Sequence, residues 1–178
     1  DLLLFFYIDG VTSIVTLQVQ KKFILKMKGM IYVDESLEIV NHIYKDSEMA
    51  ISTLTKLSNT LEKKDNKIKD TIEDIIKGYE RYFKDAKKIL NKNNCKKEKN
   101  GLIAKTMANM GIDKEVKDDN SDSAMADMII KGISMGSIDL EKKLKKYKDK
   151  EIDDKVLDLA NDFKDFQNDI IEKLKEYL

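Results

Sequence analysis

The sequence predicts an all-α fold in which four long amphipathic helices pack side by side as a bundle. Three observations carry this prediction. Four stretches of about 25 residues place apolar side chains at alternating spacings of three and four, which is the period of one helix face. The chain of 178 residues contains no proline, which would interrupt long helices. Charged residues make up 37% of it, which suits long solvated helix faces.

The first two helices are predicted over residues 34–61 and 65–90, and Asp34 is placed to cap the first. The inner face of the first helix is formed by Leu37, Val40, Tyr44, Ser47, Ile51, Leu54, Ser58 and Leu61. The inner face of the second is formed by Ile68, Ile72, Ile75, Tyr79, Tyr82, Ala86 and Ile89, widened by Ile76, Phe83 and Leu90. A stripe this wide indicates a helix that faces a core rather than one partner helix.

The last two helices are predicted over residues 123–147 and 152–177. The inner face of the first of these is formed by Ala126, Ile129, Ile133, Gly136, Leu140, Leu144 and Tyr147. The inner face of the other is formed by Ile152, Val156, Leu159, Phe163, Phe166, Ile170, Leu174 and Tyr177. Residues 118–122 offer several N-caps, and Asp153 and Asp154 suit the positive end of the closing helix.

The connections predict how the helices are joined. Short links at residues 62–64 and 148–151 make two antiparallel hairpins. The long middle connection, residues 91–122, contains Leu102, Ile103, Met107 and Met110, which predict a short extra helix that Gly111 ends. Two hairpins joined in this way match the ferritin-like arrangement, in which the link runs the length of a four-helix bundle. The alternative is a simple up-down bundle whose short helix caps one end.

Residues 1–30 have a different pattern from the rest of the chain. The apolar run Leu2–Ile8, the turn signal Asp9-Gly10 and a β-branched run after it predict a β-hairpin. Because Met27 and Met30 both precede the first helical pattern, the natural protein is expected to start at one of them. Residues 1–30 are then an N-terminal extension or leader, and residues 31–178 form the helical bundle domain.

The charges and the single cysteine exclude several classes of partner. The chain has 33 basic and 33 acidic residues, so no overall field directs it to nucleic acid or anionic lipid. Leu2–Ile8 is far too short to span a bilayer. Cys95 is the one cysteine, which excludes an internal disulfide and favours a reducing compartment. We therefore expect a cytoplasmic protein with neither nucleic acid nor membrane as a partner.

Two glycines one turn apart, Gly132 and Gly136, lie inside the third long helix, where each costs up to about 1 kcal/mol relative to alanine. Close helix packing is the expected reason, with Tyr79, Tyr82 or Phe163 filling the space. The functional alternative is a niche for a small molecule beside the glycines. Methionines cluster in the same region and are expected to fill the core, although Met-rich surfaces can also bind varied apolar partners. They are Met49, Met107, Met110, Met125, Met128 and Met135.

No metal site or cofactor is expected. A ferritin-like di-iron centre needs inward Glu residues and two Glu-x-x-His motifs, and the chain has no such motif and one histidine, His42. The weak candidates are one carboxylate from each long helix: Glu48, Glu80, Asp139 and Asp162. The calcium-loop pattern that begins at Asp118 fails at its sixth and twelfth positions, so its acids are expected to cap helices. The basic run over residues 142–148 is expected to be a solvated face because acids follow it directly.

Several stretches carry a resemblance to a known group of proteins. They are IYKDSEM at 43–49, AKTMA at 104–108, MIIKGISMG at 128–136 and IEKLKEYL at 171–178. In these the chain resembles small uncharacterised ferritin-like bundle proteins of low-GC bacteria, over residues 34–178. The resemblance implies a ferritin-like fold and a bacterial cytoplasmic setting, and it implies no reaction.

The function predicted from these observations is a non-enzymatic binding or interaction module, acting on a protein partner or by self-association. The competing class is a metal-binding ferritin-like oxidoreductase or iron-storage relative. A third possibility is a sensor that binds an apolar ligand near the short extra helix.

Overall fold

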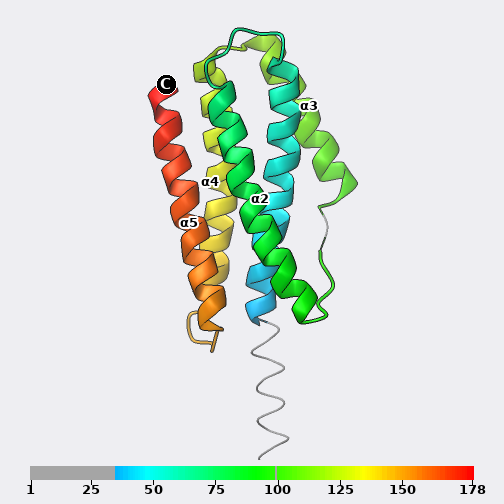
Figure 1. Cartoon of the computed structure of the whole chain (residues 1–178), viewed down its shortest axis with the longest axis vertical. Helices are drawn as coiled ribbons and strands as arrows, with labels where there is room; N and C mark the ends of the chain where they lie inside the picture. The colour runs from blue at the N-terminus through cyan, green and yellow to red at the C-terminus, as the bar shows by residue number, and fades with distance from the viewer. Residues whose placement is uncertain (1–34, 99) are drawn as a thin grey trace, which may run out of the picture.

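The computed structural model describes residues 35–98 and 100–178, and these are helical with no strand among them (Figure 1). The first helix covers residues 35–61. It is followed by α2 (Lys69–Lys92), α3 (Leu102–Asp118), α4 (Asp122–Lys146) and α5 (Asp154–Leu174), which the 3-10 turn η1 (Lys175–Tyr177) extends. The all-α class is confirmed. The predicted hairpin, the leader over residues 1–30 and the cap Asp34 lie outside the described residues.

The first helix, α2, α4 and α5 stand side by side, and α3 lies along their outside (Figure 1). At one end of this bundle, the carboxylate of Asp122 at the start of α4 accepts hydrogen bonds from Asn66 Nδ2 at 2.8 Å and Lys67 N at 3.1 Å, just before α2. At the other end, Tyr147 after α4 donates to Glu38 near the start of the first helix. α2 and α4 therefore run in the same direction, and the connection between them returns along the bundle. Of the two predicted topologies, the long crossover is the one observed.

The inner faces predicted from the spacing form one continuous core. Predicted positions that are buried include Val40, Leu54, Leu61, Ile72, Ile75, Tyr79, Ile129, Ile133, Leu140, Val156, Phe163 and Ile170. Two polar side chains, Ser47 and Gln167, are buried completely within this core. Buried polar groups ordinarily have hydrogen-bond partners, so these two positions indicate where the interior departs from simple apolar packing.

The largest differences from the predicted helix boundaries are at the start of α2 and at the end of α3. α2 begins at Lys69 rather than Asp65, because the residues before it form a turn that Asp122 holds from the neighbouring helix. α3 was expected to end at Gly111 but continues to Asp118. Beyond the glycine, Ile112 and Val116 lie one helical turn apart and are both buried, so their burial offsets the helix penalty of glycine.

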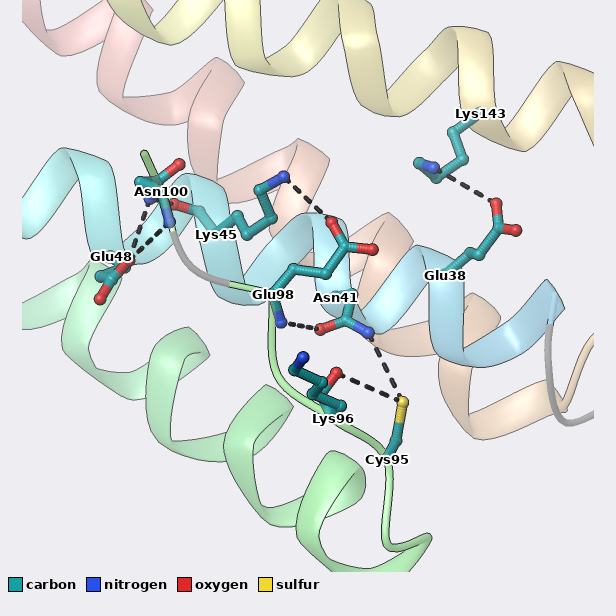
Figure 2. A network of polar contacts seen from close by, with 9 residues as sticks. All are labelled: Glu38, Asn41, Lys45, Glu48, Cys95, Lys96, Glu98, Asn100 and Lys143. Atoms are coloured by element: carbon teal, nitrogen blue, oxygen red, sulfur yellow. Dashed lines mark hydrogen bonds and ion pairs between the residues drawn. The ribbon is translucent and has the colours of Figure 1, made fainter. Parts of the chain in front are cut away.

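The connection between α2 and α3 is fastened to the first helix along one stripe of polar residues (Figure 2). Glu98 N donates to Asn41 Oδ1 at 3.1 Å, and the Glu98 carboxylate lies 3.1 Å from Lys45 Nζ. One turn farther along, Asn100 Nδ2 donates to Lys45 O at 2.7 Å and to Glu48 Oε2 at 3.1 Å. Spacings of four and three place these anchors on one face of the helix. They set the path along which α3 approaches the bundle.

Candidate functional site

A cleft of about 670 Å³ opens between the first helix, α3 and α4. Its walls are mainly apolar and include Met49, Ala50, Leu54, Leu57, Ile112, Met128, Ile129 and Ile133. Pockets for small molecules typically measure roughly 300–1,000 Å³ and combine apolar walls with a few polar groups. The size and lining of this cleft therefore suit a small, largely apolar molecule.

The two glycines of α4 both line the cleft, and their surroundings differ. At Gly132, an added Cβ would meet nothing within 4 Å among the described residues, so none of these supplies the close packing expected there. At Gly136, the Cβ would lie 2.6 Å from both carboxylate oxygens of Asp46. The close neighbour is thus a half-buried carboxylate rather than the aromatic ring that the sequence suggested. Gly132 leaves part of the cleft open, and Gly136 makes room for an acid.

The aromatic rings expected beside those glycines pack between α2 and α5 instead. Tyr82 lies 4.9 Å from Phe163 and 5.0 Å from Phe166, measured between ring centroids. The ring of Phe166 covers Gly78 of α2 so closely that a Cβ there would overlap it. Gly78 is therefore the position where a missing side chain admits a ring, and the sequence pattern did not single it out.

Asp46 is the half-buried acid of the cleft. Its Oδ2 accepts a hydrogen bond from Gln167 Nε2 on α5 at 2.8 Å. Burial raises the pKa of the Asp46 carboxyl to about 6, against the opposing effect of that hydrogen bond. Burial, and then the charge of Asp46, raise the pKa of the neighbouring Tyr79 hydroxyl above its ordinary range. Among the described residues no ion pair reaches Asp46.

The polar groups around Asp46 are incompletely satisfied. Gln167 Oε1 and Ser47 Oγ are both buried without a hydrogen-bond partner in the described part of the chain. His42 lies on the same side of the first helix, with Nε2 3.4 Å from the carbonyl oxygen of Gly136. Burial lowers the pKa of His42, which favours the neutral imidazole. A buried polar atom without a partner calls for an explanation, and Gln167 is the residue that holds the Asp46 carboxylate at the cleft.

Of the other charged groups at the cleft, Lys45 and Asp139 have counterions, and Glu115 is exposed to solvent. Lys45 pairs with Glu98 at 3.1 Å, and Asp139 pairs with Lys142 at 3.0 Å. Both pairs are largely exposed at the rim. The negative charge of Asp46 is therefore the half-buried charge for which the described chain supplies no neutralising cation.

The methionines near the cleft do not all fill the core as expected. Met125 is fully buried, whereas Met49 and Met128 line the cleft. Met135 also lines the cleft and is 70% exposed, and Met110 is 67% exposed. The side chain of Met107 lies outside the described residues. Flexible, apolar thioether groups around an opening suit a site that adapts to its ligand.

The four carboxylates offered as weak metal ligands are not gathered into one site. Each lies on a different helix: Glu48, Glu80, Asp139 and Asp162. The first three lie within ion-pair distance of lysines, namely Lys105, Lys84 and Lys142. Asp162 lies on the exposed side of α5, at a shallow groove next to α2. In the described part of the chain, no three His, Cys, Asp or Glu side chains come together in a way that would hold a metal ion.

Cys95 is half-buried, and its Sγ accepts a hydrogen bond from Asn41 Nδ2 at 3.6 Å, beside the connector contacts (Figure 2). In the predicted basic run, Lys143 and Lys146 both lie near the Glu38 carboxylate, at 3.6 and 3.8 Å. The acids of the failed calcium pattern serve helix starts, since Ser121 caps α4 and Asp122 holds the turn before α2. These features support the fold and leave the cleft as the candidate site.

Asp46 and Gln167 were not predicted as site residues, although the sequence holds a signal for both. Asp46 stands in a second stripe of the first helix with Ile39, Ile43 and Ala50, at spacings of four, three and four. Gln167 falls likewise between Phe163 and Ile170 on the stripe of α5. A polar residue inside an apolar stripe is the pattern that identifies such buried groups.

No family model matches the chain, and the curated proteins and solved structures compared with it gave no match either. Among the described helices, none combines the length and the apolar character needed to cross a membrane.

Proposed function

We propose that this chain is a ferritin-like helical bundle of the bacterial cytoplasm that acts as a non-enzymatic binding module. Its ligand is a small, largely apolar molecule that occupies the cleft between the first helix, α3 and α4. The ferritin-like assignment is supported by two helical hairpins joined through a long crossover, and by the resemblance of residues 34–178 to bacterial bundle proteins. The single cysteine and the balanced charge favour a cytoplasmic setting.

The observation that carries the proposal is the open space beside Gly132. A glycine inside a helix costs about 1 kcal/mol relative to alanine. Nothing within 4 Å prevents a side chain at this position, so packing within the described chain does not explain the glycine. A ligand that approaches the helix backbone does explain it.

α3 is the wall that admits the ligand. It is fastened to the first helix by ion pairs near its two ends, between Lys105 and Glu48 at 3.4 Å and between Asp113 and Lys56 at 2.7 Å. Its buried apolar side chains in the described part are Ile112 and Val116. Among the described side chains, α3 is held by two partly exposed ion pairs and two buried apolar residues, and a helix held in this way separates from the bundle more readily than the long helices do.

The metal-binding alternative requires carboxylates that converge from the four long helices. Glu48, Asp139 and Glu80 instead pair with lysines, so we favour the apolar ligand over the metal. If the ligand binds in this one cleft, a single substitution that fills the cleft should block binding.

Gly132→Phe tests the proposal because its ring would enter the open part of the cleft. Lys131→Phe is the matched control, since it adds the same ring at the adjacent exposed position, which does not line the cleft. The measurement is the fluorescence of N-phenyl-1-naphthylamine, a neutral apolar probe that brightens in apolar sites. Wild type and Lys131→Phe should show saturable binding, and Gly132→Phe should lose most of it. Equal binding by all three proteins would refute the proposal.

A further inference from the structure

We infer that the ligand of the cleft carries one cationic amino group on an apolar body, and that the carboxylate of Asp46 binds that group. This inference rests on the proposed function and specifies its ligand class. It goes beyond an apolar pocket because it names the charge the ligand must carry and the residue that recognises it.

The geometry places the Asp46 carboxylate where a ligand can reach it. Asp46 lines the cleft, and the absence of a side chain at Gly136 leaves room for both of its oxygens against α4. One neutral donor, Gln167 Nε2, occupies one lone pair of Oδ2. An ionised carboxylate offers about four acceptor positions, so most of its hydrogen-bonding capacity remains for a ligand.

The charge balance determines the sign of the ligand. A buried carboxylate without a counterion is unfavourable, and a cation held against it removes most of that cost. Lys45 and Lys142 do not serve, because they pair with Glu98 and Asp139 at the rim. His42 is the remaining basic group of the cleft, and its ring lies at the Gly136 carbonyl rather than at Asp46. The described chain thus provides a half-buried anion and leaves its cation to the ligand.

The side chains that line the cleft indicate what the rest of the ligand must be. Besides Asp46, the cleft is lined by Ala50, Ile129, Ile133, Met128 and other apolar side chains, which suit an alkyl or aryl group. An ammonium group forms short, charge-assisted hydrogen bonds to a carboxylate, whereas an alcohol of the same shape gains only a neutral one. A carboxylate ligand would meet repulsion from Asp46 and from Asp139 at the rim. A primary amine with an apolar body is therefore the ligand class that fits both parts of the cleft.

The test compares octylamine with 1-octanol, which share an apolar chain and differ in the head group. Calorimetric titration at pH 7.5 of the full chain should show octylamine binding about tenfold or more tightly than 1-octanol. Asp46→Asn keeps an oxygen acceptor for Gln167 and removes the charge. In this variant the preference should fall to about onefold, while the affinity for 1-octanol stays as in wild type. The matched control is Asp127→Asn, which removes the same charge from α4 outside the cleft and should keep the amine preference.

The possible results distinguish a failure of the amine assignment from a failure of the proposed function. Equal binding of both probes to wild type, or an amine preference that survives in Asp46→Asn, would overturn the amine assignment and leave the apolar cleft standing. Binding of neither probe to wild type would overturn the proposed function together with this inference. Thermal unfolding of Asp46→Asn verifies that the variant is folded, so loss of preference cannot be assigned to unfolding.

Discussion

The two glycines of α4 give a paired prediction in which one substitution, glycine to alanine, has opposite effects one helical turn apart. Gly132→Ala adds a Cβ that meets nothing within 4 Å. The variant should gain the helix propensity of alanine and become more stable by about 0.5–1 kcal/mol. This position tests whether the cleft is open in the folded protein.

Gly136→Ala adds a Cβ 2.6 Å from the oxygens of Asp46, so the carboxylate must move. Asp46 has a short side chain held by Gln167, and its displacement leaves a fully buried amide without its partner. Breaking that contact and crowding the site should cost about 1–3 kcal/mol, against a propensity gain of about 1 kcal/mol. The net result should be a loss of up to about 2 kcal/mol.

Urea unfolding followed by circular dichroism measures both effects as shifts in the midpoint at constant slope. The two variants should differ from each other by about 2 kcal/mol, with wild type between them. If both alanine variants were stabilised equally, the carboxylate of Asp46 would not lie against Gly136 and the geometry argued for the site would be wrong.

Two further predictions concern Asp46 and α3. The folded pKa of Asp46 is about 6 against an ordinary 3.8, so its contribution to stability is full below pH 3.8 and is lost as pH rises through 6. Gln167, Asp139 and Tyr79 face this side chain in both the wild type and Asp46→Asn. In urea melts, Asp46→Asn should therefore be more stable than wild type by up to ~3 kcal/mol at pH 7.5 and by little at pH 4. A stability difference that does not change with pH would contradict this. Hydrogen exchange should be faster across residues 105–113 of α3 than across residues 72–83 of α2, because few of the described side chains of α3 are buried. Equal protection of the two segments would argue against α3 as the wall that admits the ligand.

The long helices could be predicted because their apolar spacing is a local property of the sequence. Positions such as Ile72, Leu140 and Phe163 are buried as the stripes require. The end of α3 could not be predicted in the same way. Gly111 is a helix-ending signal by itself, and only the burial of Ile112 and Val116 against the bundle shows why the helix continues.

The candidate site depends on contacts between helices, which spacing alone does not reveal. The sequence identified Gly132 and Gly136 as unusual and left open whether they served packing or a niche. The distinction comes from Asp46, which reaches Gly136 across the bundle and leaves Gly132 uncovered. Gln167, which holds Asp46, lies 121 residues away in the chain. Both contacts, of Asp46 with Gly136 and of Gln167 with Asp46, depend on how the helices pack side by side.

The most direct test of the central claim is a spectrum of the protein labelled with ¹³C at the methionine methyl groups, recorded during titration with octylamine. Met49 and Met128 line the cleft, and Met125 is buried away from it. The account predicts saturable shifts of the Met49 and Met128 methyl signals and an unmoved Met125 signal. Shifts at Met125 equal to those at the cleft, or unmoved signals from both cleft methionines, would contradict it.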